Sequence, residues 1–184
     1  MHSIPPASPR LVVPESLAVP LVAVSDVLGI APILTFADTV LWNWTLVDPS
    51  QPLSPENIQS QTLFTQGRDE QNFYVCCASI ELRGVDALQI INEYNNQPAI
   101  SDAHAVESVA KSLNRLAVVV DELTAILKSV RETCDPHAFY FGIRPWFRGS
   151  DANGPDSPGW IYQGVDPSRR LELSGPSAGQ SSTM

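Results

Sequence analysis

Positive charge is scarce in this chain. Its 184 residues carry 11 lysines and arginines against 20 aspartates and glutamates, which gives a formal net charge of −9. The basic residues are scattered along the sequence, whereas binding to phosphate backbones or to anionic membrane surfaces needs a clustered positive face. The composition therefore argues against a nucleic-acid-binding protein and against a protein held at a membrane by a basic patch.

Cysteine is also scarce, and long uninterrupted apolar runs are absent. Cys76 and Cys77 are adjacent and a third cysteine stands alone, so a closed disulfide framework and a CxxC zinc site are both excluded. We therefore expect a reducing compartment, namely the cytoplasm. Residues 17–47 are interrupted by prolines and aspartates, so no membrane span is predicted. The first ten residues lack the pattern of a secretory signal.

What the chain does contain is an ordinary share of apolar residues. Hydrophobic residues make up 43% of the sequence and charged residues 17%, which excludes a wholly disordered chain. A length of 184 residues is enough for one domain with a sizeable core, or for part of a larger domain.

The distribution of proline predicts where long helices can form. Of the 16 prolines, five lie in residues 5–20 and five in residues 145–176, while residues 56–97 and 99–135 contain only other residue types. Proline lacks a backbone N–H and clashes with the preceding helical turn, so it is excluded from most helix interiors. The two proline-free stretches are therefore the places for long helices.

The second proline-free stretch predicts the clearest helix. Its apolar residues recur at alternating spacings of three and four: Val106, Val109, Leu113, Leu116, Val120, Leu123, Leu127 and Val130. We interpret this stripe as the core side of a long amphipathic helix in a bundle, capped by Ser101 or Asp102 and ended before Pro136. A coiled-coil dimer is the alternative, although Val119 and Ile126 widen the stripe.

Five further segments are expected to be helical: 17–28, 32–46, 54–63, 73–94 and 136–147. The last of them is rich in aromatic residues and is expected to kink or end near Pro145. Residues 149–184 are predicted as loop, with a short extended piece at 160–162. The expected fold class is all-α, a helical bundle. Its expected divisions are a proline-rich, linker-like start (1–16), a partial helical domain (17–148) and an active-site loop (149–184).

An arginine among aromatic residues is the most distinctive chemical feature. Arg144 is flanked by five aromatic residues: Phe139, Tyr140, Phe141, Trp146 and Phe147. A guanidinium fork can hold a carboxylate through two hydrogen bonds while the rings pack on a flat ligand. The alternative is a structural arginine whose stem covers apolar surface. The histidines, His2, His104 and His137, show no spacing typical of a catalytic triad or a metal site.

Two longer stretches resemble one known family. Residues 32–44, PILTFADTVLWNW, resemble the PPILxYADxVLxNW segment of indoleamine 2,3-dioxygenases, and residues 174–182, SGPSAGQSS, resemble their GGSAGQSS loop. Between them the order also fits: a Phe-Phe type of helix at Phe73, a long amphipathic helix, an Asp-Pro turn before an Ala-Phe run, and then Arg144. Residues 162–164 resemble the family's Tyr-Glu-Gly stretch. The resemblance runs from about residue 14 to residue 182.

The resemblance implies a haem-dependent, all-α enzyme of the kynurenine pathway. Such enzymes use haem b and O2 to open the indole ring of L-tryptophan, or of a related indoleamine, giving N-formylkynurenine from tryptophan. The positions that match the family's substrate-binding residues are Arg144 for the carboxylate, together with Phe73, Phe139, Phe147, Ser177 and Ala178. The positions that match its distal haem pocket are Phe36, Thr39, Val40, Tyr74 and Cys77.

The chain departs from the family pattern at several positions. Phe36 stands where a tyrosine is common, Cys77 stands where the mammalian enzymes have a serine, Arg148 replaces a small residue, and Pro176 replaces a glycine. The family's proximal histidine lies on a helix beyond the SAGQSS loop, and the family also has a small N-terminal helical domain. We expect both to be absent from this chain, so that its residues include no axial ligand to the iron.

Three functional hypotheses follow from the resemblance. The first is a truncated tryptophan-degrading haem dioxygenase that is inactive alone and self-associates through uncovered apolar faces. The second is a non-catalytic, degenerate helical protein that binds a ligand or a partner. The third is another haem enzyme of the wider tryptophan-dioxygenase superfamily, which the SAGQSS string disfavours.

Overall fold

The computed structural model describes residues 11–96, 103–150, 159–169, 171 and 173–176. Helices dominate it, which confirms the predicted all-α class. Contacts divide the described chain into two compact units, one built from the residues up to Phe36 and from Arg144 onward, the other from Ala37 to Ile143. Within these described residues no helix combines the length and apolarity needed to cross a membrane. The predicted boundaries at residues 16 and 148 stay predictions.

The first unit forms a small core around one helix and a two-stranded sheet. Strand β1 (Val12–Val13) pairs in parallel with β4 (Ile161–Tyr162), which confirms the predicted extended piece at 160–162. Helix α1 (Glu15–Leu28) buries Ala18 and Val22 against Tyr162. The Tyr162 hydroxyl donates a hydrogen bond to the Pro32 carbonyl over 2.9 Å, so this buried phenol has a partner.

Helix α1 ends where the sequence predicts, and glycine is the reason. Gly29 has a φ of 69°, in the left-handed region. The N–H of Ile30 donates to the carbonyl of Ser25 over 3.0 Å, and the N–H of Gly29 to that of Asp26 over 3.3 Å. This pair of bonds is the Schellman motif, which satisfies carbonyls that the helix end leaves open.

The prediction of a helix over residues 32–46 is wrong. The structure has only a five-residue π-helical turn (Ala37–Leu41), followed by strand β2 (Trp44–Leu46). The buried Asn43 separates the two: its amide nitrogen donates to the carbonyls of Thr39 and Thr62, and its oxygen accepts from the Thr62 N–H over 2.9 Å. Such side-chain bonds offer the backbone an alternative to a helix.

The prediction of a helix over residues 54–63 is also wrong. A 3-10 turn (Pro55–Asn57) leads directly into strand β3 (Ile58–Ser60), which pairs antiparallel with β2. Asn57 closes the loop between the strands, because its oxygen accepts from the Asp48 N–H over 2.8 Å and its amide donates to the Pro52 carbonyl over 3.0 Å. The chain thus forms a hairpin where its local pattern suggests a helix.

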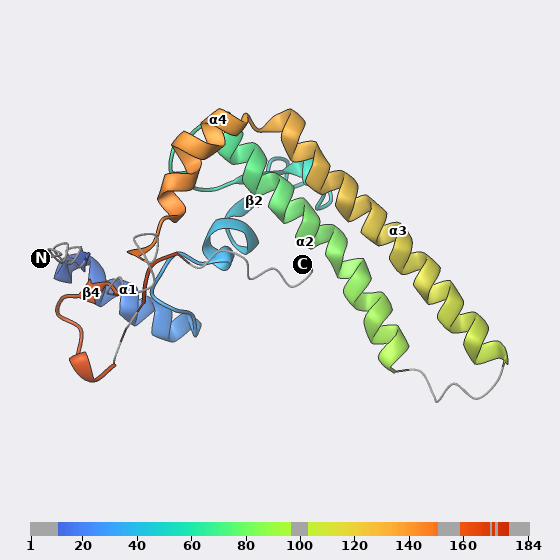
Figure 1. Cartoon of the computed structure of the whole chain (residues 1–184), viewed down its shortest axis with the longest axis horizontal. Coiled ribbons are helices and arrows are strands. Elements are labelled where there is room, and N and C mark those ends of the chain that lie inside the picture. Colours follow the sequence, from blue (N-terminus) through green and yellow to red (C-terminus); the bar gives the residue numbers. More distant parts are fainter. Residues whose placement is uncertain (1–10, 97–102, 151–158, 170, 172, 177–184) are drawn as a thin grey trace, which may run out of the picture. The chain divides into compact units, whose positions relative to one another are not determined.

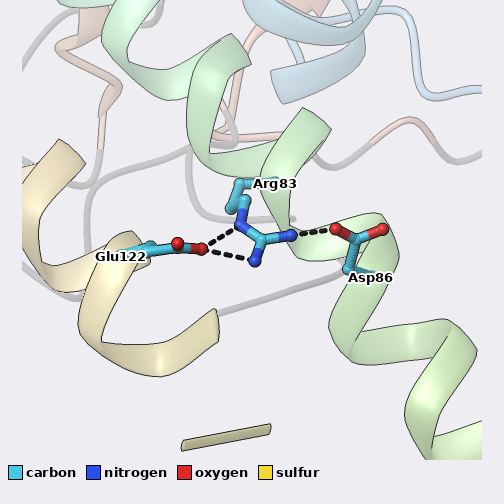
Figure 2. A network of polar contacts seen from close by, with 3 residues as sticks. All are labelled: Arg83, Asp86 and Glu122. Atoms are coloured by element: carbon cyan, nitrogen blue, oxygen red, sulfur yellow. Dashed lines mark hydrogen bonds and ion pairs between the residues drawn. The ribbon is translucent and has the colours of Figure 1, made fainter. Parts of the chain in front are cut away.

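Helices α2 (Arg68–Asn95) and α3 (Ala103–Thr133) lie side by side along their length (Figure 1). Both helices were expected. Helix α2 begins five residues before Phe73, where the sequence predicted its start. The predicted caps of α3, Ser101 and Asp102, lie outside the described residues. Arg83 of α2 binds Glu122 of α3 and also Asp86 on its own helix (Figure 2). Exposed ion pairs of this kind each contribute at most about 1 kcal/mol, so side-chain packing sets the pairing.

Only one half of the predicted apolar stripe of α3 is covered, and the buried face of the helix is shifted away from the other half. Every second residue of the expected stripe is exposed: Val106, Leu113, Val120 and Leu127 have exposed fractions of 50–61%. Val119 and Ser112 are buried instead, with 3% and 8% exposed. The helix carries two neighbouring apolar seams, and α2 covers only one of them. The coiled-coil alternative stays a prediction.

Residues 136–147 form three successive helical turns of different type. They are α4 (Pro136–Ala138), a π-helical turn (Phe139–Ile143) and a 3-10 turn (Arg144–Phe147). Asp135 begins the series as an N-cap, because its carboxylate accepts from the Ala138 N–H over 2.8 Å. The aromatic segment is therefore helical, as predicted, but irregular.

A buried carboxylate organises the start of α2. Glu70 has none of its surface exposed, and it accepts hydrogen bonds from the Phe64 N–H, the Thr65 N–H and the Thr65 hydroxyl over 2.8, 2.7 and 2.6 Å. These three donors offset the cost of burying its oxygens. The helix has Gly67 at its N-cap, which has no side chain to cap with, so Glu70 ties the preceding loop to the first turn.

We expect Glu70→Ala to lower the free energy of unfolding by about 2–3 kcal/mol, because it removes the acceptor of three hydrogen bonds and leaves a small cavity. Urea denaturation followed by circular dichroism measures the loss. Glu93→Ala is the matched control, since Glu93 makes only an exposed ion pair with Arg115; it should cost less than about 1 kcal/mol. Equal losses in the two variants would contradict a special role for Glu70.

Candidate functional site

The second unit gathers six of the predicted site residues around α2. The π-helical turns Ala37–Leu41 and Phe139–Ile143 both contact this helix. The six residues are Thr39, Val40, Phe73, Tyr74, Cys77 and Phe139. Phe36, Arg144 and Phe147 belong to the other unit, while Ser177 and Ala178 lie outside the described residues. The roles assigned to all of these residues stay predictions.

An aromatic pair is the centre of this group. The rings of Phe73 and Phe139 are 4.8 Å apart between centroids and tilted by 51°, and the Phe73 and Tyr74 rings are 5.8 Å apart and tilted by 56°. Tilted arrangements of this kind suit the charge distribution of aromatic rings. Phe73 and Phe139 are only partly buried, so the pair keeps apolar surface for a further flat ring.

Tyr74 brings a phenol that stays neutral. It is 3% exposed, and its burial, together with the negative charge of nearby Glu70, raises the pKa of its hydroxyl. Both causes disfavour the phenolate. Tyr74 therefore adds a polar but uncharged group beside the aromatic pair.

Cys77 behaves as a protonated thiol. Burial, reinforced by Cys76 and Glu81, raises its pKa to about 12. Burial also raises the pKa values of Cys76 and Cys134, and the Cys76 thiol donates to the Ile126 carbonyl over 3.4 Å. A thiolate is the nucleophile and the metal ligand, so none of these cysteines is prepared for either task at neutral pH.

Val40 borders an apolar groove of about 280 Å³ on α2. Leu41 of the π-helical turn and Trp44 of β2 also line it, and the α2 residues that line it are Ala78, Glu81, Leu82, Val85 and Leu88. Glu81 is the charged member of this set. The predicted distal-pocket residue Val40 therefore lies next to apolar surface, as a water-excluding residue must.

The arginine cluster is divided between the units. Arg144 lies in an exposed 3-10 turn with Trp146 and Phe147, while Tyr140 and Phe141 belong to the other unit and pack edge to face at 4.9 Å. Arg144 interacts with other groups of the protein, and the carboxylate-binding role assigned to it stays a prediction.

The loop at residues 174–182 is tied down at its first residues. The Ser150 N–H donates to the Ser174 carbonyl over 2.5 Å. Gly175 has a φ of 121°, and a side chain there would come within 2.7 Å of the Gly149 backbone and 3.0 Å of Trp160. Only glycine suits this position, so close backbone packing explains the glycine that stands before Pro176.

Metal-binding groups are sparse in the part of the chain that the structure describes. No three His, Cys, Asp or Glu side chains gather there as a ligand set. The ring of His137 packs against Phe141 at 4.6 Å, and His104 lies exposed in the first turn of α3. His2 lies outside the described residues.

Sequence reasoning missed two residues that support the site. Asn43 holds the π-helical turn that carries Thr39 and Val40, and Glu70 holds the start of α2 and adjoins Tyr74. Asn43 stands inside the motif at residues 32–44, flanked by two tryptophans, so a polar residue in an apolar motif was the available signal. For Glu70 the signal was weaker, since acidic residues are common in the first turn of a helix.

Comparison with known proteins points to a single family. The sequence profile described as indoleamine 2,3-dioxygenase matches residues 1–184. The chain is 34% identical to indoleamine 2,3-dioxygenase 2 of Homo sapiens over 97% of its length, and 33% identical to indoleamine 2,3-dioxygenase 1 of Rattus norvegicus over 94%. It is 31% identical to indoleamine 2,3-dioxygenase of Saccharomyces cerevisiae over 95%. The matches cover 43%, 42% and 40% of those proteins, so the chain spans about two fifths of their length.

The raised pKa of Cys77 predicts that alkaline pH destabilises the fold. Unfolded Cys77 loses its proton near the ordinary value of 9.0, whereas the folded thiol keeps it up to about 12. The stability this provides is complete below pH 9 and is lost as the pH rises toward 12. We expect a loss of about 1–2 kcal/mol by pH 10.5.

Urea denaturation of the wild type and of Cys77→Ala between pH 7.5 and 10.5 measures this effect. The variant should lose less stability over the range, because one titrating group is gone, while the shifted Cys76, Cys134 and Tyr74 still contribute in both proteins. Parallel pH profiles for the two proteins would show that Cys77 ionises equally when folded and unfolded.

Proposed function

Because the chain belongs to the indoleamine 2,3-dioxygenase family, we propose that it forms the substrate side of a haem-dependent site that opens the indole ring of L-tryptophan with O2. The observation that carries the proposal is the pair Phe73 and Phe139, whose rings lie 4.8 Å apart with apolar surface still available. A related indoleamine is an equivalent substrate for such a pair. N-formylkynurenine is the expected product from tryptophan. The three cysteines, all free, suit the proposed cytoplasmic location.

The proposed binding mode divides the substrate into a ring and a carboxylate. The Phe73 and Phe139 rings pack on the indole. For the carboxylate, the family resemblance implies Arg144, whose guanidinium would donate two hydrogen bonds to it. Thr39, Val40 and the neutral thiol of Cys77 exclude water from the far side of the ring. Because Tyr74 and Cys77 both stay protonated at neutral pH, they bring no charge whose hydration would draw water toward an apolar ring.

The described residues do not fit haem as iron ligands. Among the described residues, His104 and His137 lie exposed and outside any metal-binding cluster, and burial keeps the cysteine thiols protonated, so this donor set offers neither a preorganised metal site nor a thiolate. We therefore propose that the axial ligand comes from outside this chain's described residues. No step through haem is assigned to them; their part is to bind and orient the substrate and to keep water out.

A second candidate function is a non-catalytic helical protein that binds a ligand or a partner. The exposed apolar row of α3 favours it, because contiguous exposed apolar surface commonly marks a site of interaction with a partner. The row consists of Val106, Leu113, Val120 and Leu127. A monomer that unfolds cooperatively and ignores haem would support this second function. Self-association or poor solubility would favour a fragment of the enzyme.

We expect the purified 184-residue chain to bind haem weakly and to form no N-formylkynurenine from tryptophan. The reason is the donor set of the described residues, which offers the iron no preorganised protein ligand. Absorbance titration with haemin and chromatographic product analysis under reducing conditions measure both. A sharp histidine-haem spectrum together with turnover would overturn the proposal that the ligand lies elsewhere.

In a protein extended to a full-length relative's size, Arg144→Ala should raise the KM for tryptophan roughly 10- to 100-fold, because a charge-assisted carboxylate contact is lost. Arg144→Lys keeps the charge but loses the planar fork of the guanidinium, so its KM should lie between the values for the wild type and for Arg144→Ala. Arg115→Ala is the matched control, since that exposed arginine pairs with Glu93. An unchanged KM in Arg144→Ala would remove Arg144 from substrate binding.

A further inference from the structure

Three side chains on one face of α2 bind backbone groups in the last two turns of α3 and just beyond its end. Asp69, Asn72 and Cys76 follow each other at spacings of three and four, which places them on the same side of the helix. The Asp69 carboxylate accepts from the Asp135 N–H over 2.7 Å, and the Asn72 amide donates to the Thr133 carbonyl over 2.5 Å. The Cys76 contact with Ile126 continues this row one turn further.

These contacts act where α3 would otherwise leave backbone groups without helical partners. Thr133 is the last residue of α3, and the final carbonyls of a helix lack partners within it. Asn72 supplies a donor to one of them, and Asp69 supplies an acceptor to the N–H two residues later. The start of α2 therefore holds the chain at the point where it leaves α3.

The next link runs from Asp135 to Phe139. The carboxylate of Asp135 accepts from the Ala138 N–H over 2.8 Å, and its carbonyl accepts from the Phe139 N–H over 2.9 Å. Asp135 is thus bound on both sides: its own N–H by Asp69, and its oxygens by the turn that presents Phe139. The Phe139 ring then returns to α2, where it packs on Phe73.

We propose that Asp69 and Asn72 are positioning residues for the aromatic pair. The contacts form a closed circuit that begins and ends on α2, from Asp69 through Asp135 and Phe139 to Phe73. Phe73 follows Asn72 directly and lies one turn after Asp69, so both ends of the circuit are on the same rigid turns of helix. The separation of the two rings is therefore set by polar residues that touch no ligand.

This inference rests on the proposed function only for the identity of the ligand, an indole ring. Asp69, Asn72 and Asp135 are partly or wholly exposed, so water can replace their hydrogen bonds when one partner is removed. Losing Asp69 should therefore change the position of Phe139 more than it changes stability. Small displacements of groups that orient a ligand weaken binding strongly.

The test compares Asp69→Ala with Asp69→Asn in the 184-residue chain. Asparagine keeps an oxygen that accepts from the Asp135 N–H, whereas alanine does not. Glu122→Gln is the matched control, because it weakens a different polar link between α2 and α3, the contact with Arg83 (Figure 2). The readouts are the nuclear Overhauser effect between the Phe73 and Phe139 rings, the Kd for L-tryptophan from chemical-shift titration, and the urea midpoint.

We expect Asp69→Ala to lose the effect between the two rings and to bind tryptophan roughly tenfold more weakly. Asp69→Asn should keep both, and Glu122→Gln should lower the urea midpoint while leaving the ring contact unchanged. Asn72→Ala is the second variant should Asp69→Ala fail to fold, and it should weaken the ring contact in the same direction.

Three results would overturn the inference. They are an unchanged ring contact in Asp69→Ala, an equal loss in Asp69→Asn, and a loss in Glu122→Gln as large as in Asp69→Ala. A wild-type chain that shows the ring contact and its dependence on Asp69, but binds no tryptophan, supports the positioning role and counts against the proposed function.

Discussion

The pairing of α2 with α3 is the constraint on which the unit from Ala37 to Ile143 depends. Helix α2 meets α3 along one side, the π-helical turn and the hairpin along another, and Phe139 near its start. A helix with neighbours on several sides cannot rotate to relieve strain at one of them without breaking contacts at the others. The direction of Phe73, Tyr74 and Cys77 is therefore set by how α2 packs against α3 and its other neighbours.

Polar residues at the ends of elements complement the apolar packing in this small unit. Glu70 joins the preceding loop to α2, Asn43 joins the π-helical turn to the hairpin, and Asp69 joins the end of α3 to the start of α2. Each satisfies backbone groups that irregular structure leaves open, which an apolar side chain cannot do. Specific side chains can thus hold irregular turns in place, and one of these turns carries Phe139 of the aromatic pair.

The successes and failures of prediction follow from the range of the interactions involved. The α2 and α3 helices were predictable because proline exclusion and apolar periodicity act within a few turns. The structures of segments 32–46 and 54–63 were not predictable, because they depend on contacts between the two segments. Asn43 binds Thr62, and β2 pairs with β3. For the site, motif resemblance led to Phe73 and Phe139, but residues that only hold others in place, such as Asp69, carry no chemical signature of their own.

The sequence by itself determined the family, the all-α class, the ends of α1 and α3, and the two aromatic residues that meet on α2. These follow from local rules such as proline geometry and glycine at a helix end, and from motif letters that remain readable without a fold. Only the tertiary structure decided which seam of α3 is covered, because Val106 and Val109 are equally apolar and differ only in where α2 lies. It likewise decided that the pKa of Cys77 is raised and that Asp69 reaches Asp135, since burial and contacts between residues 66 positions apart exist only in the folded chain.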